Sequence, residues 1–147
     1  MKKLNLFFVI SMIFVVFLLT TGCGGSPTAP PIEEDFINII SVTPDSGLVD
    51  GVDTDFTVVV EYNLFTYNQG ILMIGFNNKE SINSFRLVNN ADFLVNKGSG
   101  THEFNVTVKP KDWGSQGDFK VYVNISEYPH PSTWTPLDGD TYALTFN

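Results

Sequence analysis

Strict alternation of apolar and polar side chains is the feature that most constrains how this chain folds. Residues 101–109 show it most clearly, and residues 55–62, 118–126 and 141–146 repeat it. In the first segment the apolar positions are His102, Phe104, Val106 and Val108. Because successive side chains of a β-strand point to opposite faces, a period of two predicts a half-buried strand in each segment.

Four further segments complete the strand pattern. Residues 36–42 are rich in branched side chains, residues 70–77 are almost continuously apolar, and residues 84–88 and 92–96 are shorter. Clusters of turn residues separate the segments, and no period of 3.6 residues follows the first 20 residues. The sequence therefore predicts an all-β domain of about seven to eight strands, arranged as a two-sheet sandwich.

The N-terminus is a separable segment. Lys2 and Lys3 precede an apolar run over residues 4–19, which as a helix would span roughly 24 Å, less than the ~30 Å of a hydrocarbon core. This layout predicts a secretory signal peptide over residues 1–22. The alternative is an uncleaved membrane helix.

Cys23 is the only cysteine and follows this segment directly. The sequence Thr20-Thr21-Gly22-Cys23 resembles the lipobox of bacterial lipoproteins. The resemblance implies that a diacylglycerol is attached to Cys23, that the chain is cleaved before it, and that the lipid anchors the protein outside the cytoplasm, on the cell membrane or the outer membrane. The alternative is ordinary secretion with a free thiol, which is a liability in an oxidising compartment.

The mature chain is expected to consist of a tether and one domain. Residues 23–35 combine the lipidated cysteine with Gly, Ser, Pro and acidic residues, which predicts a flexible tether, and residues 36–147 form the domain. Removing Lys2 and Lys3 leaves 6 basic against 16 acidic residues, a net charge of −10. Because binding to phosphates needs clustered Lys and Arg, this balance excludes nucleic acid as a partner.

Two stretches of the domain resemble bacterial immunoglobulin-like domains. They are "ISVTPDSGLVDGVDTDFTVVVEY" (residues 40–62) and "DWGSQGDFKVYV" (residues 112–123), the second matching the entry to strand F of that fold through Gly117, Phe119, Val121 and Val123. Phe119 replaces the corner tyrosine, and the disulfide and its packing tryptophan are absent. The resemblance implies an immunoglobulin-like β-sandwich over residues 36–147.

Catalytic motifs are absent from the sequence. His102 and His130 are the only histidines; they have no zinc-type spacing, and His102 falls on the apolar side of its segment, as a core histidine would. No nucleophile elbow, Walker loop or dinucleotide fingerprint occurs. We therefore expect a protein that is not an enzyme and has no cofactor other than a possible structural calcium ion.

The calcium candidate is an acidic loop. Four aspartates lie close together with glycines between them: Asp45, Asp50, Asp53 and Asp55. Carboxylates at this spacing can hold Ca²⁺, but the segment lacks the spacing of an EF-hand. The alternative is turn chemistry, since Asp favours turns and strand ends.

The binding candidate is the loop over residues 127–140, which is long for a connection between strands. Prolines flank its aromatic and imidazole side chains. With Trp113, these side chains are predicted to form a contact surface for a protein or glycan partner: Tyr128, His130 and Trp134. The alternative is that Trp134 folds back and caps the domain. The sequence predicts a non-catalytic binding or structural module at the cell envelope. Two variants stay open: an accessory subunit of an envelope assembly docking through a sheet edge, and a carbohydrate-binding module using the aromatic loop.

Overall fold

The computed structural model describes residues 33–77, 81–133 and 135–147. The chain divides into two units, residues 1–31 and 32–147, and the following concerns the second unit. The predicted signal peptide and Cys23 lie outside the described residues, as does most of the tether. Among the residues described, no helix has the length and apolar character needed to cross a bilayer.

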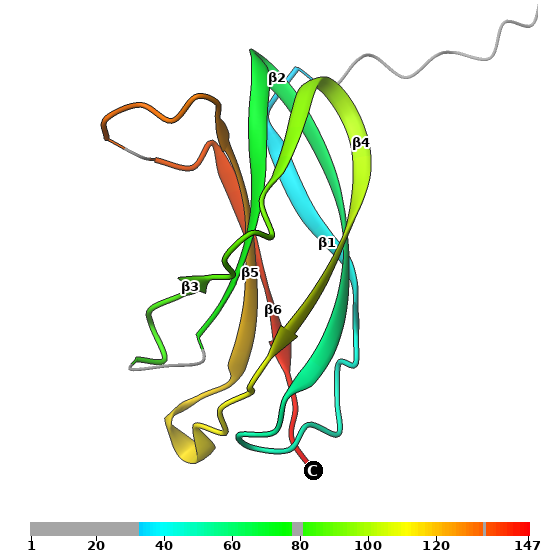
Figure 1. Ribbon diagram of the computed structural model, residues 1–147, viewed down its shortest axis with the longest axis vertical. Helices are drawn as coiled ribbons and strands as arrows, with labels where there is room; N and C mark the ends of the chain where they lie inside the picture. The colour runs from blue at the N-terminus through cyan, green and yellow to red at the C-terminus, as the bar shows by residue number, and fades with distance from the viewer. Residues whose placement is uncertain (1–32, 78–80, 134) are drawn as a thin grey trace, which may run out of the picture. The chain divides into compact units, whose positions relative to one another are not determined.

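The domain is all-β, as predicted, and its strands form one curled antiparallel sheet (Figure 1). The elements are β1 (Phe36–Thr43), β2 (Thr54–Phe76), β3 (Arg86–Leu87), β4 (Phe93–Val108), the 3-10 turn η1 (Gly114–Gln116), β5 (Phe119–Glu127) and β6 (Asp138–Leu144). The sheet runs in the order β1-β2-β5-β6, and both β3 and β4 also pair with β2.

The strand count differs from the predicted seven to eight, because the described residues form six strands. Four of the predicted segments merge into two long strands. The segments at residues 55–62 and 70–77 merge into β2, and those at residues 92–96 and 101–109 merge into β4. Residues 63–69 and 97–100 interrupt the alternating pattern, so the sequence predicts separate strands. The two strands instead bend together, and the register between them shifts between Leu64 and Gln69.

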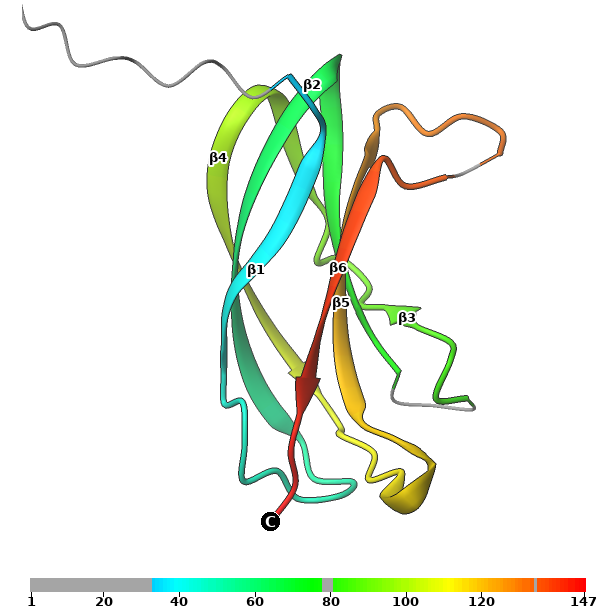
Figure 2. The same ribbon diagram turned by 180° about the vertical axis from the view of Figure 1, so that it is seen from behind.

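The bend of β2 and β4 forms an arch at one end of the sheet, which is visible from both sides (Figures 1 and 2). Asp35, just before β1, fixes this arch: its carboxylate accepts hydrogen bonds from the backbone N–H groups of Phe65 and Thr66 and from the Thr66 hydroxyl. Burial raises the pKa of Asp35, but these hydrogen bonds outweigh it, so the pKa lies below its ordinary value. The residue that ends the tether is thus tied to the domain.

The core comes from the alternating positions that the sequence singled out. In β5, the alternating residues Phe119, Val121, Val123 and Ile125 are all buried. The matching positions of β2 and β4 are buried as well: Phe56, Val58, Val60, Phe104, Val106 and Val108. Phe56, Phe76 and Phe119 form an aromatic cluster with ring centroids 5.3–6.4 Å apart. The period-two prediction is confirmed at these positions.

Candidate functional site: the open edge of β4

One side of the curled sheet, where β1 meets β6, is closed by side chains; we call it the closed edge. Asp138 and Asp140 of β6 each accept a hydrogen bond, at 2.9 Å, from the backbone N–H groups of Ile37 and Ile39 in β1. Further along, the Leu48 N–H donates to the carbonyl of Thr145. Carboxylates and a short parallel bridge therefore take the place of a continuous β-ladder.

The outer side of β4 has no such cover. Along a strand, the backbone groups of successive residues point to opposite sides. The N–H of Ile37 points away from β2, so the backbone groups of the next residue, Asn38, face β2 and pair with Glu61. Val60, beside Glu61, therefore bonds on the opposite side, to β4 at His102. The alternate residues of β4 then present their backbone groups outward: Thr101, Glu103, Asn105 and Thr107.

No backbone hydrogen bond joins these four outward-facing residues to any other described residue. Their side chains are exposed and ordered by short contacts on the sheet surface. Asn105 accepts from Thr57 and donates to Glu103, and Thr107 donates to Asp55. We call the stretch Thr101–Thr107 the open edge.

An aromatic stack lies across the bend of β4. Phe93 and His102, at opposite ends of the bend in β4, stack with ring centroids 3.8 Å apart, and Phe104 meets His102 edge-on at 4.5 Å. His102 thus lies on the apolar side of its strand, as expected. Burial lowers the pKa of His102, and the neighbouring Glu103 carboxylate opposes this in part.

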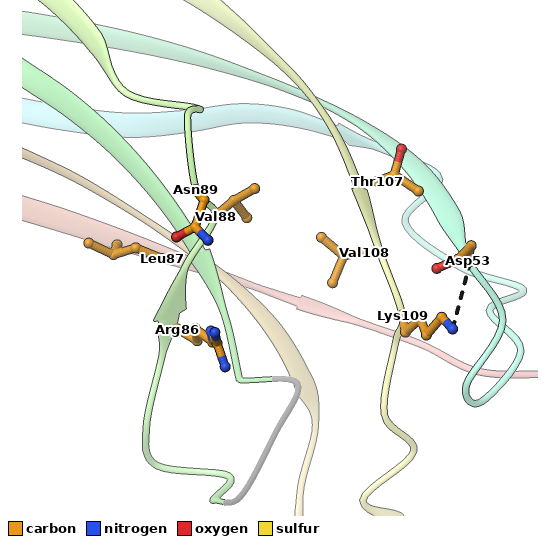
Figure 3. Close-up of a pocket in the computed structure, with 8 residues that line it drawn as sticks. All are labelled: Asp53, Arg86, Leu87, Val88, Asn89, Thr107, Val108 and Lys109. Carbon is orange, nitrogen blue, oxygen red and sulfur yellow. Dashed lines mark ion pairs between the residues drawn. The ribbon is translucent and has the colours of Figure 1, made fainter.

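Further along β4 than the stack, a groove of about 350 Å³ lies between β4 and the segment that contains β3 (Figure 3). Its lining residues are Asp53, Arg86, Leu87, Val88, Asn89, Thr107, Val108 and Lys109. Gly75 of β2 permits the close approach of the β3 segment, since a Cβ there would lie 2.9 Å from the carbonyl oxygen of Arg86. Lys109 forms an ion pair with Asp53 across 3.8 Å, whereas Arg86 has no ion pair with a described residue.

The four aspartates of the predicted calcium loop have separate partners. Asp45 accepts from the Ser46 hydroxyl, and Asp50 accepts from the N–H of Asp112 and pairs with Lys111. Asp53 pairs with Lys109, and Asp55 accepts from Thr107 at 2.6 Å. In the described part of the chain, no three His, Cys, Asp or Glu side chains gather as metal ligands do. These contacts fit the turn alternative, and calcium binding stays a prediction.

The predicted aromatic site is divided between the two ends of β5. Tyr128 and His130 are exposed in the loop that follows β5, whereas Trp113 precedes η1 at the other end (Figures 1 and 2). A nine-residue strand spans about 30 Å. Trp113 packs against the core and donates from Nε1 to the carbonyl of Asn77 at 3.0 Å. It therefore lies apart from the loop, and Trp134 is outside the described residues.

Sequence reasoning did not find the open edge or Arg86 as a groove residue. Arg86 is the single arginine of an acidic chain, which is the one signal that could have marked it. An unpaired edge has no local signal, because it depends on which strands pair elsewhere.

Comparisons with known proteins do not assign a family. Neither protein-family models nor curated proteins match this chain. Among solved structures, the solution conformation of apokedarcidin is similar at 17% sequence identity and a TM-score of 0.38, over 76% of this chain and 98% of that chain. A TM-score this low supports no conclusion on fold or function.

Proposed function

We propose that this protein is a lipid-anchored, non-catalytic docking module of the cell envelope, which binds a partner protein by adding a strand to the open edge. The observation that carries the proposal is the unpaired outer side of β4 in a sheet whose other edge is closed by Asp138 and Asp140. An exposed strand edge is a template for pairing with another chain, and proteins usually cover it.

The side chains of the open edge restrict which partners fit. No proline occurs between Phe93 and Val108, so β4 has no residue that would block pairing. Glu103 in the open edge and Lys109 just after β4 instead place one charge of each sign on this side of the sheet. A partner strand must therefore present complementary charges at matching positions, which gives selectivity.

The anchor completes the proposal. Lipidation at Cys23 would hold the domain at the extracytoplasmic surface of the cell membrane or outer membrane, through the tether of residues 23–35. The domain itself is proposed to be an immunoglobulin-like sandwich, in which the arch of β2 and β4 passes from one layer to the other. The glycan-binding variant keeps only Tyr128 and His130 among the described residues, since Trp113 is distant.

The test compares Asn105→Pro with Asn105→Ala in the full-length lipoprotein. Both remove the Asn105 side-chain contacts, but only proline removes its outward N–H. A photo-crosslinking amino acid at Thr101 should give an adduct with one envelope protein, retained in Asn105→Ala and lost in Asn105→Pro. Placed at Glu61, on the same face but in the central strand β2, it should give none. Adducts that persist in Asn105→Pro, or that form equally from position 61, would overturn the proposal.

A further inference from the structure

We infer that the partner on the open edge is a second copy of this chain, paired antiparallel so that Glu103 of each copy lies opposite Lys109 of the other. The inference rests on the proposed function and names its partner. A two-fold interface brings the same edge of both copies together, so every contact occurs twice. The edge must then be complementary to itself in shape, hydrogen bonding and charge.

The backbone of the open edge meets the first two requirements. The outward-facing residues are Thr101, Glu103, Asn105 and Thr107, followed by Lys109 immediately after the strand. A two-fold antiparallel pairing that sets Asn105 opposite Thr107 places outward-facing residues opposite one another throughout. This gives about eight backbone hydrogen bonds, since each such pair exchanges two.

Charge and the end of β4 together select this register. With Asn105 opposite Thr107, Glu103 falls opposite Lys109, and the pair occurs twice. A shift by two residues in one direction sets Asn105 opposite itself and leaves Glu103 facing uncharged Thr107. A shift in the other direction sets Glu103 opposite Lys111, which lies beyond Pro110 and past the end of β4, where the chain has left the strand. Opposite charges directly across an antiparallel pair stabilise it, whereas like charges destabilise it.

The present partners of both charged side chains leave them available. Lys109 pairs with Asp53 at 3.8 Å, with both side chains about two-thirds exposed, so the ion pair is weak. Glu103 accepts a hydrogen bond from Asn105 on the same strand, which holds its carboxylate at the sheet surface. Exchange of Asp53 for the Glu103 of a second copy therefore removes no strong interaction.

The experiment is sedimentation equilibrium of the full chain in density-matched detergent micelles. We expect a monomer–dimer equilibrium in which Glu103→Lys and Lys109→Glu each raise the dissociation constant about tenfold, because each brings like charges face to face twice. The double variant Glu103→Lys/Lys109→Glu should restore it. Glu61→Lys, the same charge reversal on central strand β2, is the matched control and should leave it unchanged. Urea unfolding of each variant verifies that the fold survives.

Each result decides between the inference and the proposed function. A protein that stays monomeric at all concentrations overturns the second copy as partner, while crosslinking that depends on the Asn105 N–H would still support docking on another protein. A dimer that the double variant does not restore overturns this register. If Asn105→Pro changes neither dimerisation nor crosslinking, the open edge is no interface and both proposals fall.

Discussion

The closed edge and the open edge differ in how their outward-facing backbone groups are hydrogen-bonded. Along the closed edge, the outward N–H groups of β1 are satisfied by Asp138 and Asp140, which reach across from β6. Along the open edge, the equivalent groups of β4 have no partner among the described residues. A chain that covers one edge with two placed carboxylates and leaves the other uncovered offers a specific surface for another strand.

The largest effect is expected at Asn77, which ties the segment between β2 and β3 to the start of β5. Its side chain is fully buried, donates to the carbonyls of Ile82 and Asp118, and accepts from the N–H of Lys120. Asn77→Ala leaves three partly buried backbone groups without this partner, so the free energy of unfolding should fall by about 3 kcal/mol. Urea denaturation measures the loss.

Asn89→Ala is the control for this prediction. Asn89 is an exposed asparagine that lines the groove, and its removal should change the free energy of unfolding by less than about 0.5 kcal/mol. Equal effects of the two substitutions would mean that the buried hydrogen bonds of Asn77 do not stabilise the fold.

Opening the closed edge should have the next largest effect. Asp138→Ala/Asp140→Ala removes two hydrogen bonds to charged acceptors, which we expect to lower the free energy of unfolding by about 2 kcal/mol, since both sites are half-buried. The amides of Ile37 and Ile39 should then exchange with solvent as fast as those of Asn105 and Thr107. Hydrogen exchange measures both edges in one experiment, and protection of Ile37 that survives in the variant would show that the carboxylates do not close this edge.

Local sequence patterns predicted the buried core of the strands but not the difference between the two edges. Alternation is local, so it identified Phe119, Val121 and the other core positions of the strands correctly. The contact of Asp138 with Ile37 joins residues 101 positions apart. Asp138 and Asp140 fall in the predicted loop over residues 127–140, whereas the structure places them in β6. The arch of β2 likewise passes through residues 63–69, where the alternating pattern is interrupted, and its hydrogen bonds to Asp35 are tertiary contacts. Edges are therefore features of strand order, which local patterns do not encode.

A smaller effect should link pH to the stack beneath the arch. Burial lowers the pKa of His102 in the folded state, so near and below the ordinary value of about 6.5 the unfolded chain binds more protons than the folded one. The contribution of His102 is therefore fully favourable above pH 6.5 and is lost as the pH falls through that value. The urea midpoint of the wild type should drop more between pH 8 and pH 5.5 than that of His102→Gln.

The second histidine supplies the control. His130 is exposed in the loop after β5, so His130→Gln should keep the pH dependence of the wild type. If His130→Gln removes the dependence and His102→Gln retains it, the stack of Phe93 on His102 does not exclude water as the geometry implies.

The smallest effect is expected for the ion pair of Lys109 and Asp53 beside the open edge. The aspartates of the two edges bind different kinds of partner. Asp138 binds a backbone N–H held in a strand, whereas Asp53 binds the end of a flexible lysine side chain at 3.8 Å. Lys109→Ala in monomeric protein should therefore lower the free energy of unfolding by less than about 0.5 kcal/mol, as should Lys111→Ala, which removes the similar pair with Asp50. A loss well above 1 kcal/mol for Lys109 alone would mean that Lys109 is committed to Asp53, and a second copy could not recruit it. Near-equal, small losses would mean that Lys109 is available to whatever strand the open edge receives.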